Sequence, residues 1–218
     1  MNAAGILILD KRAGISSAKA IAEVQRSLGI EKIGHAGTLD PFATGILVCL
    51  LNGATRVASY AVAGNKRYSG IMHFGRTTRS DDSTGETLSE SPLEIDRELL
   101  VALVPKYLGE IQQVPPQVSA IKVAGERAYE RARSGKTTEL LPRTVNILRF
   151  DLEVVAAQRV RYLIECSPGT YIRSLARDLG QDLGIGGCVE SLRREYSAPF
   201  PIANAKILEE LTLKDILP

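Results

Sequence analysis

The chain has 218 residues, of which 44% are hydrophobic and 24% are charged, and its formal net charge at pH 7 is +2. This is the composition of an ordinary soluble globular protein, which can bury a large core without a disulfide framework. A charge of +2 is too small to indicate nucleic-acid binding by itself, so such a function would depend on where the basic residues lie.

The cysteines and histidines exclude two kinds of site. Three cysteines are widely spaced, at positions 49, 166 and 188, and only two histidines are present. We therefore expect neither a zinc site nor a disulfide framework, and a reducing cytoplasm as the location. No stretch approaches the length of a membrane span, and the first residues lack the basic segment of a signal peptide, so we expect neither membrane association nor secretion.

The first elements expected are a strand and a helix. Residues 6–9 form a short apolar run, which is typical of a buried strand. Ser16 or Ser17 can then cap a helix whose apolar residues recur at helical spacing and which ends at Gly29.

A loop rich in glycine follows, at residues 34–47, and it leads into a second apolar run. Within it, Pro41 fixes its own backbone angle and pushes Asp40 out of the α region. Glycines on both sides permit backbone geometries or close approaches that a side chain would block. An aspartate before proline is also common turn chemistry. Local chemistry thus leaves two interpretations, a structural turn or an acid held in a defined direction.

The next strand begins at Lys66, where alternation places Tyr68 on the same face as Met72 and Phe74. From its position alone, Tyr68 is equally well interpreted as a core aromatic residue with its hydroxyl at the rim. Its functional interpretation depends on the rest of the chain.

Residues 77–98 carry seven acidic residues against two basic ones. We expect a solvated acidic loop that avoids RNA, although the pair Asp81 and Asp82 could bind a stray cation. A helix capped by Asp96 should follow this loop.

Residues 122–149 have the opposite bias, with seven basic and three acidic residues. Contact with phosphates is physically plausible there, although a run of charge is more often a solvated face. Beyond it, apolar residues alternate over 148–154 and 160–166, which predicts an antiparallel hairpin.

A strand-to-helix junction follows, and Arg173 lies at the start of its helix, where the helix dipole mildly disfavours a cation. A cation at this position suggests a specific partner. Together these elements predict an α+β domain with a mixed, mostly antiparallel central sheet flanked by helices and loops.

The fourteen residues from Gly34 to Leu47 closely resemble the catalytic motif of the TruB family of tRNA pseudouridine synthases. Further motifs occur in the family's order: Asp10–Lys11, Lys66–Tyr68, Pro115–Lys122 with Tyr129, Gly169–Arg173 and the segment around Leu192. The matching covers nearly the whole chain, to about Pro201. One departure is Arg12, which stands where the family usually has proline.

The resemblance implies a single catalytic domain with the pseudouridine synthase fold over residues 1–218, including a basic RNA-gripping segment around residues 114–145. Family members usually continue into a C-terminal PUA domain. Only a short tail, residues 205–218, follows here, so we expect the catalytic domain without a PUA domain.

The resemblance further implies an isomerase that converts uridine to pseudouridine in the T loop of tRNA without a cofactor or a metal. The glycosidic bond breaks, the uracil rotates and a carbon–carbon bond forms. The catalytic residues implied are Asp40 as the essential carboxylate, Arg173 as its salt-bridge partner, Tyr68 and Tyr171. Whether Asp40 attacks the sugar, attacks the base or removes a ribose proton stays open.

The target base is inaccessible in a folded stem-loop, so it must be flipped out and held by stacking and edge contacts. The resemblance implies the following substrate-binding residues: His35, Thr38, Leu192, Lys11, Lys66, Lys122 and Tyr129. We expect the T arm of tRNA as the partner, no obligate protein partner, and a monomer. The alternative is an RNA-binding or tRNA-folding module whose catalysis is dispensable or lost.

Overall fold

The computed structural model describes residues 4–119, 122–123, 126–127 and 140–218. The chain divides into two compact units: unit 1, Met1–Ser69 with Leu192–Pro218, and unit 2, Gly70–Ser191. Two strands, β4 (Lys66–Phe74) and β12 (Gly187–Ser197), have residues in both units. No helix in the described part of the chain is long and apolar enough to cross a membrane.

Unit 1 is built around the central strand β3 (Thr44–Leu51). Strands β1 (Gly5–Lys11) and β2 (Ile33–Ala36) pair antiparallel with β3, and β12 pairs parallel with its first residues. β13 (Phe200–Pro201) pairs with β12. The helical segments are α1 (Ser17–Leu28), η1 (Asn52–Val57), α2 (Ala58–Val62), η3 (Ile202–Asn204), η4 (Leu208–Glu210) and η5 (Leu213–Asp215).

Both faces of the β1–β3 pair are buried. One cluster joins these strands to α1 and contains Leu7, Leu9, Leu47, Cys49, Leu51, Ala20 and Val24. The alternate residues of the same strands pack with α2, in a cluster of Ile8, Ile46, Val48, Leu50, Ala58 and Val62. Burial on both faces explains why β3 is a continuous apolar run rather than an alternating one.

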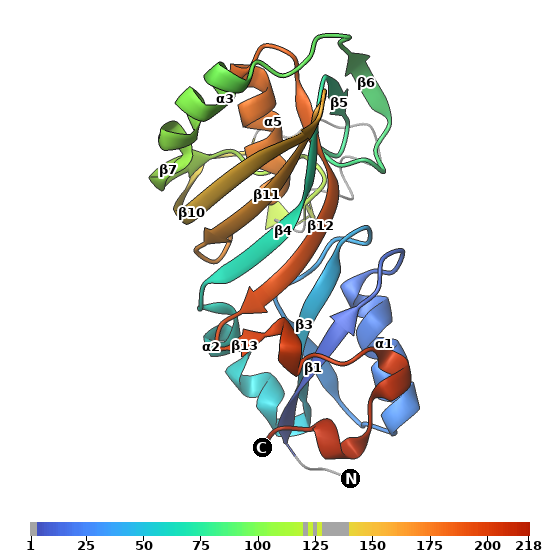
Figure 1. Ribbon diagram of the computed structural model, residues 1–218. Helices are drawn as coiled ribbons and strands as arrows, with labels where there is room; N and C mark the ends of the chain where they lie inside the picture. Colours follow the sequence, from blue (N-terminus) through green and yellow to red (C-terminus); the bar gives the residue numbers. More distant parts are fainter. Residues whose placement is uncertain (1–3, 120–121, 124–125, 128–139) are drawn as a thin grey trace. The chain divides into compact units, whose positions relative to one another are not determined.

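The predicted strand and helix at the N-terminus are confirmed as β1 and α1 (Figure 1). Ser16 is the cap of α1, because its side chain accepts a hydrogen bond from the Lys19 amide, and Gly29 ends the helix with φ 63°. The C-terminal segment returns along β1, where the Ile6 amide donates to the Leu217 carbonyl at 2.8 Å.

Unit 2 is built on a sheet in the order β12-β4-β11-β10-β7. Its strands, besides β4 and β12, are β7 (Gly109–Gln113), β10 (Arg143–Ala156) and β11 (Arg159–Cys166). Two small hairpins are formed by β5 (Arg76–Thr78) with β6 (Thr87–Glu90), and by β8 (Lys122–Val123) with β9 (Glu126–Arg127). The helical segments are α3 (Arg97–Leu103), η2 (Val104–Tyr107) and α5 (Ile172–Asp182).

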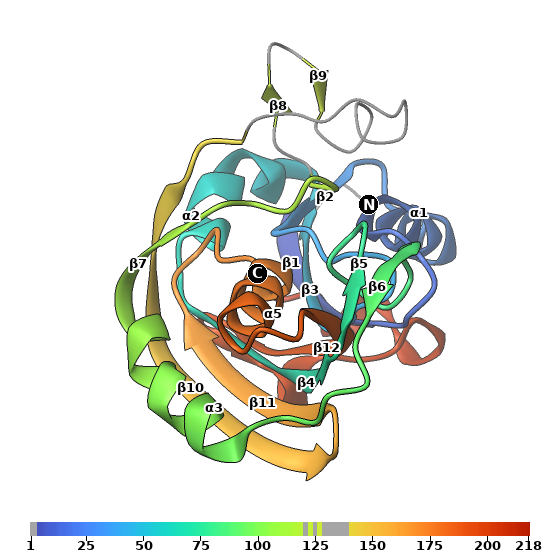
Figure 2. The ribbon, with the colours of Figure 1, turned by 90° about the horizontal axis from the view of Figure 1, so that it is seen from above.

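Helix α5 lies inside the curve formed by β7, β10 and β11 (Figure 2). The predicted hairpin is confirmed by the β10–β11 pairing, in which Phe150 is opposite Ile164. Asp96 caps α3 as expected, through bonds from the amides of the first helical turn. The mixed, mostly antiparallel sheet agrees with the predicted α+β class.

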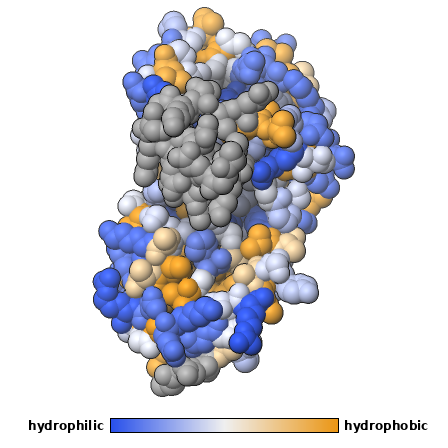
Figure 3. Space-filling model, turned by 180° about the vertical axis from the view of Figure 1, so that it is seen from behind, coloured by the Kyte–Doolittle hydropathy of each residue, from blue (hydrophilic) through white to orange (hydrophobic). Residues whose placement is uncertain are grey.

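The surface of the described residues has no broad apolar face in the view of Figure 3, where hydrophobic residues are interspersed among hydrophilic ones outside the grey atoms. Single exposed apolar side chains are normal on a folded chain.

Candidate functional site

The loop that carries Asp40 connects β2 to β3 in unit 1. Asp40 is half-buried, Leu39 before it is buried, and Thr38 is exposed. The Asp40 carbonyl accepts a hydrogen bond from the Ala43 amide at 3.1 Å, which closes a tight turn. The predicted glycine-flanked turn is therefore present, and Asp40 lies within it.

Residues 14–17, at the start of α1, hold this loop. The Ser17 hydroxyl accepts from the Leu39 amide at 2.8 Å and donates to the Leu39 carbonyl at 2.9 Å. The Gly14 amide donates to the Pro41 carbonyl at 2.8 Å. Ser17 thus bonds the peptide before Asp40, and Gly14 bonds the peptide after Pro41.

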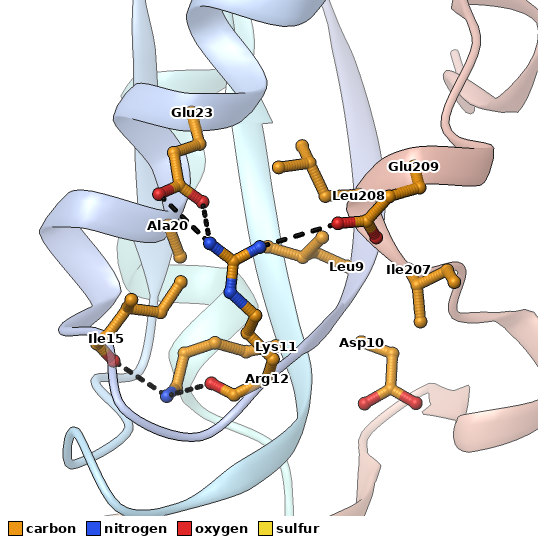
Figure 4. Close-up of a pocket in the computed structure, with 10 residues that line it drawn as sticks. All are labelled: Leu9, Asp10, Lys11, Arg12, Ile15, Ala20, Glu23, Ile207, Leu208 and Glu209. Atoms are coloured by element: carbon orange, nitrogen blue, oxygen red, sulfur yellow. Dashed lines mark hydrogen bonds and ion pairs between the residues drawn. The ribbon is translucent and has the colours of Figure 1, made fainter.

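Lys11, for which the resemblance implies a role in substrate binding, is only 1% exposed. Its ammonium donates to the carbonyls of Ile15 at 2.8 Å and Arg12 at 2.9 Å (Figure 4). It also donates to the Pro41 carbonyl at 3.4 Å. Burial lowers the pKa of Lys11 to about 8, and the negative charge of Asp40 opposes that shift. The structure therefore places Lys11 under the Asp40 loop, as a support for its backbone.

Arg12, which replaces the family's usual proline, points away from Lys11 in Figure 4. Its guanidinium lies 3.2 Å from a Glu23 oxygen of α1 and 3.5 Å from a Glu209 oxygen of η4. These three charged residues line one pocket, together with apolar residues of β1, α1 and η4. Arg12 thus links α1 to the C-terminal segment through two ion pairs, which a proline at this position could not form.

Arg194 of β12 holds both ends of the Asp40 loop. It is 1% exposed, and it donates from Nε to the Ile46 carbonyl at 2.7 Å and from Nη2 to the Gly37 carbonyl at 3.0 Å. Gly45 has φ +97°, and a Cβ there would lie 2.4 Å from the Arg194 carbonyl oxygen. Only glycine permits this approach of the two backbones.

The remaining predicted residues of unit 1 lie on three strands. His35, in β2, is half-buried, and burial together with the charge of Arg194 lowers its pKa, so the imidazole is neutral at pH 7. Leu192, in β12, is 7% exposed. Lys66 is buried and donates to the carbonyls of Val62 and Gly64. Tyr68 of β4 is half-buried.

In unit 2, Arg173 stands in the first turn of α5 and is 3% exposed. Its guanidinium donates to the carbonyls of Ser80 at 2.8 Å and Val118 at 3.0 Å. It also lies 3.6 Å from an Asp82 oxygen. The cation at the helix start therefore has specific partners, as its unfavourable position in the dipole suggested.

The prediction of a solvated acidic loop is wrong for Asp81 and Asp82. Asp82 is 4% exposed, and one of its oxygens accepts from the Ser80 hydroxyl at 2.9 Å and from the Thr84 hydroxyl at 2.6 Å. Asp81 lies 3.1 Å from Arg177, and burial raises its pKa to about 6. Hydroxyl residues on both sides of the pair are the sequence signal for such a bonded turn.

Tyr171 is fixed through its backbone at the start of α5. Its amide donates to the Gln113 side chain at 2.8 Å, and its carbonyl accepts from the same side chain at 3.0 Å. Gln113 is fully buried, and nothing in its sequence context indicated this role. The Tyr171 ring lies 5.5 Å from the Arg143 guanidinium, within the range of a cation–π contact.

The structure does not test the predicted roles of Lys122 and Tyr129, or the predicted salt bridge between Asp40 and Arg173. Tyr129 lies outside the described residues, with most of the predicted RNA-gripping segment, and for Lys122 the structure describes only its place in β8. Asp40 belongs to unit 1 and Arg173 to unit 2, so their salt bridge stays a prediction. In the described ranges, no group of three or more His, Cys, Asp or Glu side chains could hold a metal ion.

Comparison with curated proteins gives a consistent set of relatives. The chain is 46% identical over 214 residues to the tRNA pseudouridine synthase B of Arthrobacter sp. (strain FB24), an alignment that covers 95% of this chain and 70% of the relative. It is 43% identical over 207 residues to the protein of the same name from Stutzerimonas stutzeri (strain A1501), with 95% and 68% covered.

Solved structures give the same fold. A chain in the structure of an H/ACA RNP bound to a substrate RNA containing 2′-deoxyuridine has a TM-score of 0.71 at 26% identity, and a chain in a Cbf5-Nop10-Gar1 complex has 0.71 at 28%. They cover 95% and 96% of this chain, which spans 52% of each solved chain. The predicted pseudouridine synthase fold is thereby confirmed.

The match to a protein family rests on the same region as the Asp40 loop and the start of α5. Residues 25–172 match the family described as TruB family pseudouridylate synthase (N terminal domain). Together with relatives that are more than 40% identical over nearly the whole chain, this match shows that the chain belongs to the TruB family of pseudouridylate synthases.

Proposed function

We propose that this chain is a tRNA pseudouridine synthase that isomerises a uridine of the T loop, and that Asp40 is its catalytic carboxylate. The observation that carries the proposal is the fixed loop around Asp40, in which Ser17 bonds the peptide before the acid and the Ala43 amide bonds the Asp40 carbonyl. The names of the relatives, tRNA pseudouridine synthase B, support the substrate class. Enzymes need a reacting group held in one geometry, whereas a structural turn does not.

The reaction is an internal rearrangement of the nucleoside. The bond from the ribose carbon to the uracil nitrogen breaks, and the uracil turns while it stays bound. A bond from the ribose to a uracil carbon then forms, that carbon loses its proton, and the freed nitrogen takes up a proton. No electrons are gained or lost overall, so the groups needed are a carboxylate and proton acceptors.

Electrostatics around Asp40 suit an ionised carboxylate. The attraction between Asp40 and the Lys11 ammonium raises the pKa of Lys11 against the effect of burial, and it favours the charged form of both groups. We propose that Arg173 is a further counter-ion, because its planar guanidinium can hold a carboxylate with two parallel bonds. In unit 2 it is already held in place by Ser80 and Val118.

The other predicted residues then have roles in binding. We propose that Tyr68 and Tyr171 contact the flipped base, that Leu192 lines its pocket, and that the neutral His35 and the exposed Thr38 contact the RNA. Lys122 and Tyr129 belong to the basic segment proposed to hold the T arm. Lys11 and Lys66 act through the backbone carbonyls that they bind. We further propose that the chain acts as a monomer.

Release of tritium from tRNA labelled at the uracil carbon that loses its proton tests the function. We expect release by the wild type and none above background by Asp40→Asn. Asp10→Asn is the matched control, because it removes another carboxylate of unit 1, one that pairs with Arg193 at 2.6 Å. A wild type that binds tRNA and releases no label would support the RNA-binding or tRNA-folding module instead.

A further inference from the structure

We propose that Ser17 is a positioning residue, whose hydroxyl fixes the peptide that leads into Asp40. The inference rests on the proposed function, in which Asp40 is the catalytic carboxylate. It assigns to the first residue of α1 a task in the reaction that a helix residue does not normally have.

The contacts of Ser17 are unusual for a hydroxyl at the start of a helix. The residue is 2% exposed, and its hydroxyl bonds both backbone polar groups of Leu39, the amide at 2.8 Å and the carbonyl at 2.9 Å. Leu39 is itself 4% exposed. One hydroxyl thus serves as donor and acceptor for a buried residue 22 positions away.

These bonds constrain the backbone of Asp40. The Leu39 carbonyl lies in the same rigid peptide plane as the Asp40 nitrogen, so fixing one fixes the other. On the other side, the Pro41 ring sets its own φ, and the Pro41 carbonyl is held by the Gly14 amide at 2.8 Å. The peptide between Asp40 and Pro41 is itself held by the Ala43 amide, which donates to the Asp40 carbonyl at 3.1 Å. With both neighbouring peptides held, the carboxylate moves mainly about its side-chain torsions.

Helix capping does not account for the Ser17 hydroxyl. The cap of α1 is Ser16, whose hydroxyl accepts from the Lys19 amide at 3.2 Å. Ser16 is exposed and has no bond to the Asp40 loop among the described contacts. The two adjacent serines therefore form a matched pair, in which one hydroxyl stabilises the helix and the other holds the loop.

Loss of the Ser17 hydroxyl should change the rate of the chemical step more than the binding of tRNA. The Leu39 amide and carbonyl would have to find water or other partners, and the peptide before Asp40 could then rotate. A misplacement of the reacting group by about 1 Å can cost on the order of 100-fold in rate. We expect Ser17→Ala to lower the single-turnover rate by about 10- to 100-fold, with the Kd for tRNA within about threefold of wild type.

The test compares Ser17→Ala, Ser17→Cys and Ser16→Ala by single-turnover kinetics at saturating tRNA, each well below its own unfolding temperature. Ser17→Cys keeps the shape but has only a weak donor and acceptor, so it should lose rate as Ser17→Ala does. Ser16→Ala should lower stability but keep the wild-type rate. Equal rates for Ser17→Ala and wild type, or an equal loss in Ser16→Ala, would overturn the inference.

Amide hydrogen exchange of Leu39 is a readout that does not depend on activity. The amide should exchange at least about tenfold faster in Ser17→Ala than in wild type, and at the wild-type rate in Ser16→Ala. Faster exchange in Ser17→Ala together with an inactive wild type would show that the hydroxyl holds the loop and that the proposed function is wrong. Unchanged exchange would show that the hydroxyl does not hold the loop.

Discussion

Gly45, where the Asp40 loop enters β3, leaves no room for a side chain. Its φ is +97°, and a Cβ would lie 2.4 Å from the carbonyl oxygen and 2.7 Å from the nitrogen of Arg194. These are backbone atoms, which cannot turn aside as the end of a flexible side chain can. Gly45→Ala should therefore push β12 away from β3 at the point where Arg194 holds the loop.

The expected cost has two parts. A positive φ costs a residue with a Cβ about 1–2 kcal/mol. Forcing extra atoms into a rigid packed contact costs about 1–3 kcal/mol. The sum, about 2–5 kcal/mol, corresponds to a fall in Tm of roughly 4–20 °C for a chain of this size. The loss of stability in unit 1 should be measured from the hydrogen exchange of the β3 amides, which gives the free energy of opening of that strand.

Gly29→Ala is the matched control. Gly29 ends α1 with φ +63°, and nothing lies within 4 Å of the position a Cβ would take. Its cost should be only the backbone part, about 1–2 kcal/mol. If the two variants lose equal stability, the close approach of Arg194 contributes nothing and the reasoning is refuted. If Gly45→Ala is folded and fully active, the loop geometry is not what makes Asp40 competent.

Three further predictions concern unit 2 and the thiols. Arg173→Lys should lower the free energy of unfolding of unit 2 by about 1.5–3 kcal/mol. The planar guanidinium bonds two carbonyls and lies beside Asp82, and a single ammonium cannot make all of these contacts. An unchanged denaturant midpoint of unfolding would contradict this prediction. Asp81→Asn should stabilise unit 2 more at pH 7 than at pH 4. Burial raises the pKa of Asp81 to about 6, so the carboxyl is protonated in the folded chain at pH 4 and becomes charged, at a cost in stability, as pH rises through 6. An equal gain in stability at pH 4 and pH 7 would exclude burial of the charge as the cause. All three cysteines are buried, and burial raises the pKa of Cys49 to about 12, so a thiol reagent at pH 8 should modify none of them before the chain unfolds. Rapid modification of the native chain would show that a thiol is accessible.

The elements that the sequence predicted well are those set by local patterns. Helix α1 has a cap, a helical apolar stripe and a terminal glycine within fourteen positions of the chain, and all three act as expected. The β10–β11 hairpin follows from alternation on both sides of a short turn. Periodicity and turn chemistry need no knowledge of distant contacts, so they can be read from neighbouring residues.

The side-chain contacts that hold the site could not be predicted in the same way. Ser17 bonds Leu39 across 22 positions, and Arg194 bonds Gly37 across 157. Asp82 looked like part of a solvated acidic loop, because nothing near it in the sequence shows that Arg173 lies beside it. The sequence around a hydroxyl or charged side chain does not show which distant residue it will bond in the folded chain.

The buried basic residues change how the chain can attract a polyanion. Those that the structure describes are Lys11, Lys66, Arg173 and Arg194, against one buried acid, Asp82. Without these five, the chain's 27 basic and 25 acidic residues leave acidic residues in the majority by one. Only side chains that touch phosphates release counterions, so the dependence of RNA affinity on salt should report on the exposed basic residues alone. Affinity for RNA should then depend on where the exposed basic residues lie, rather than on the net charge of the chain.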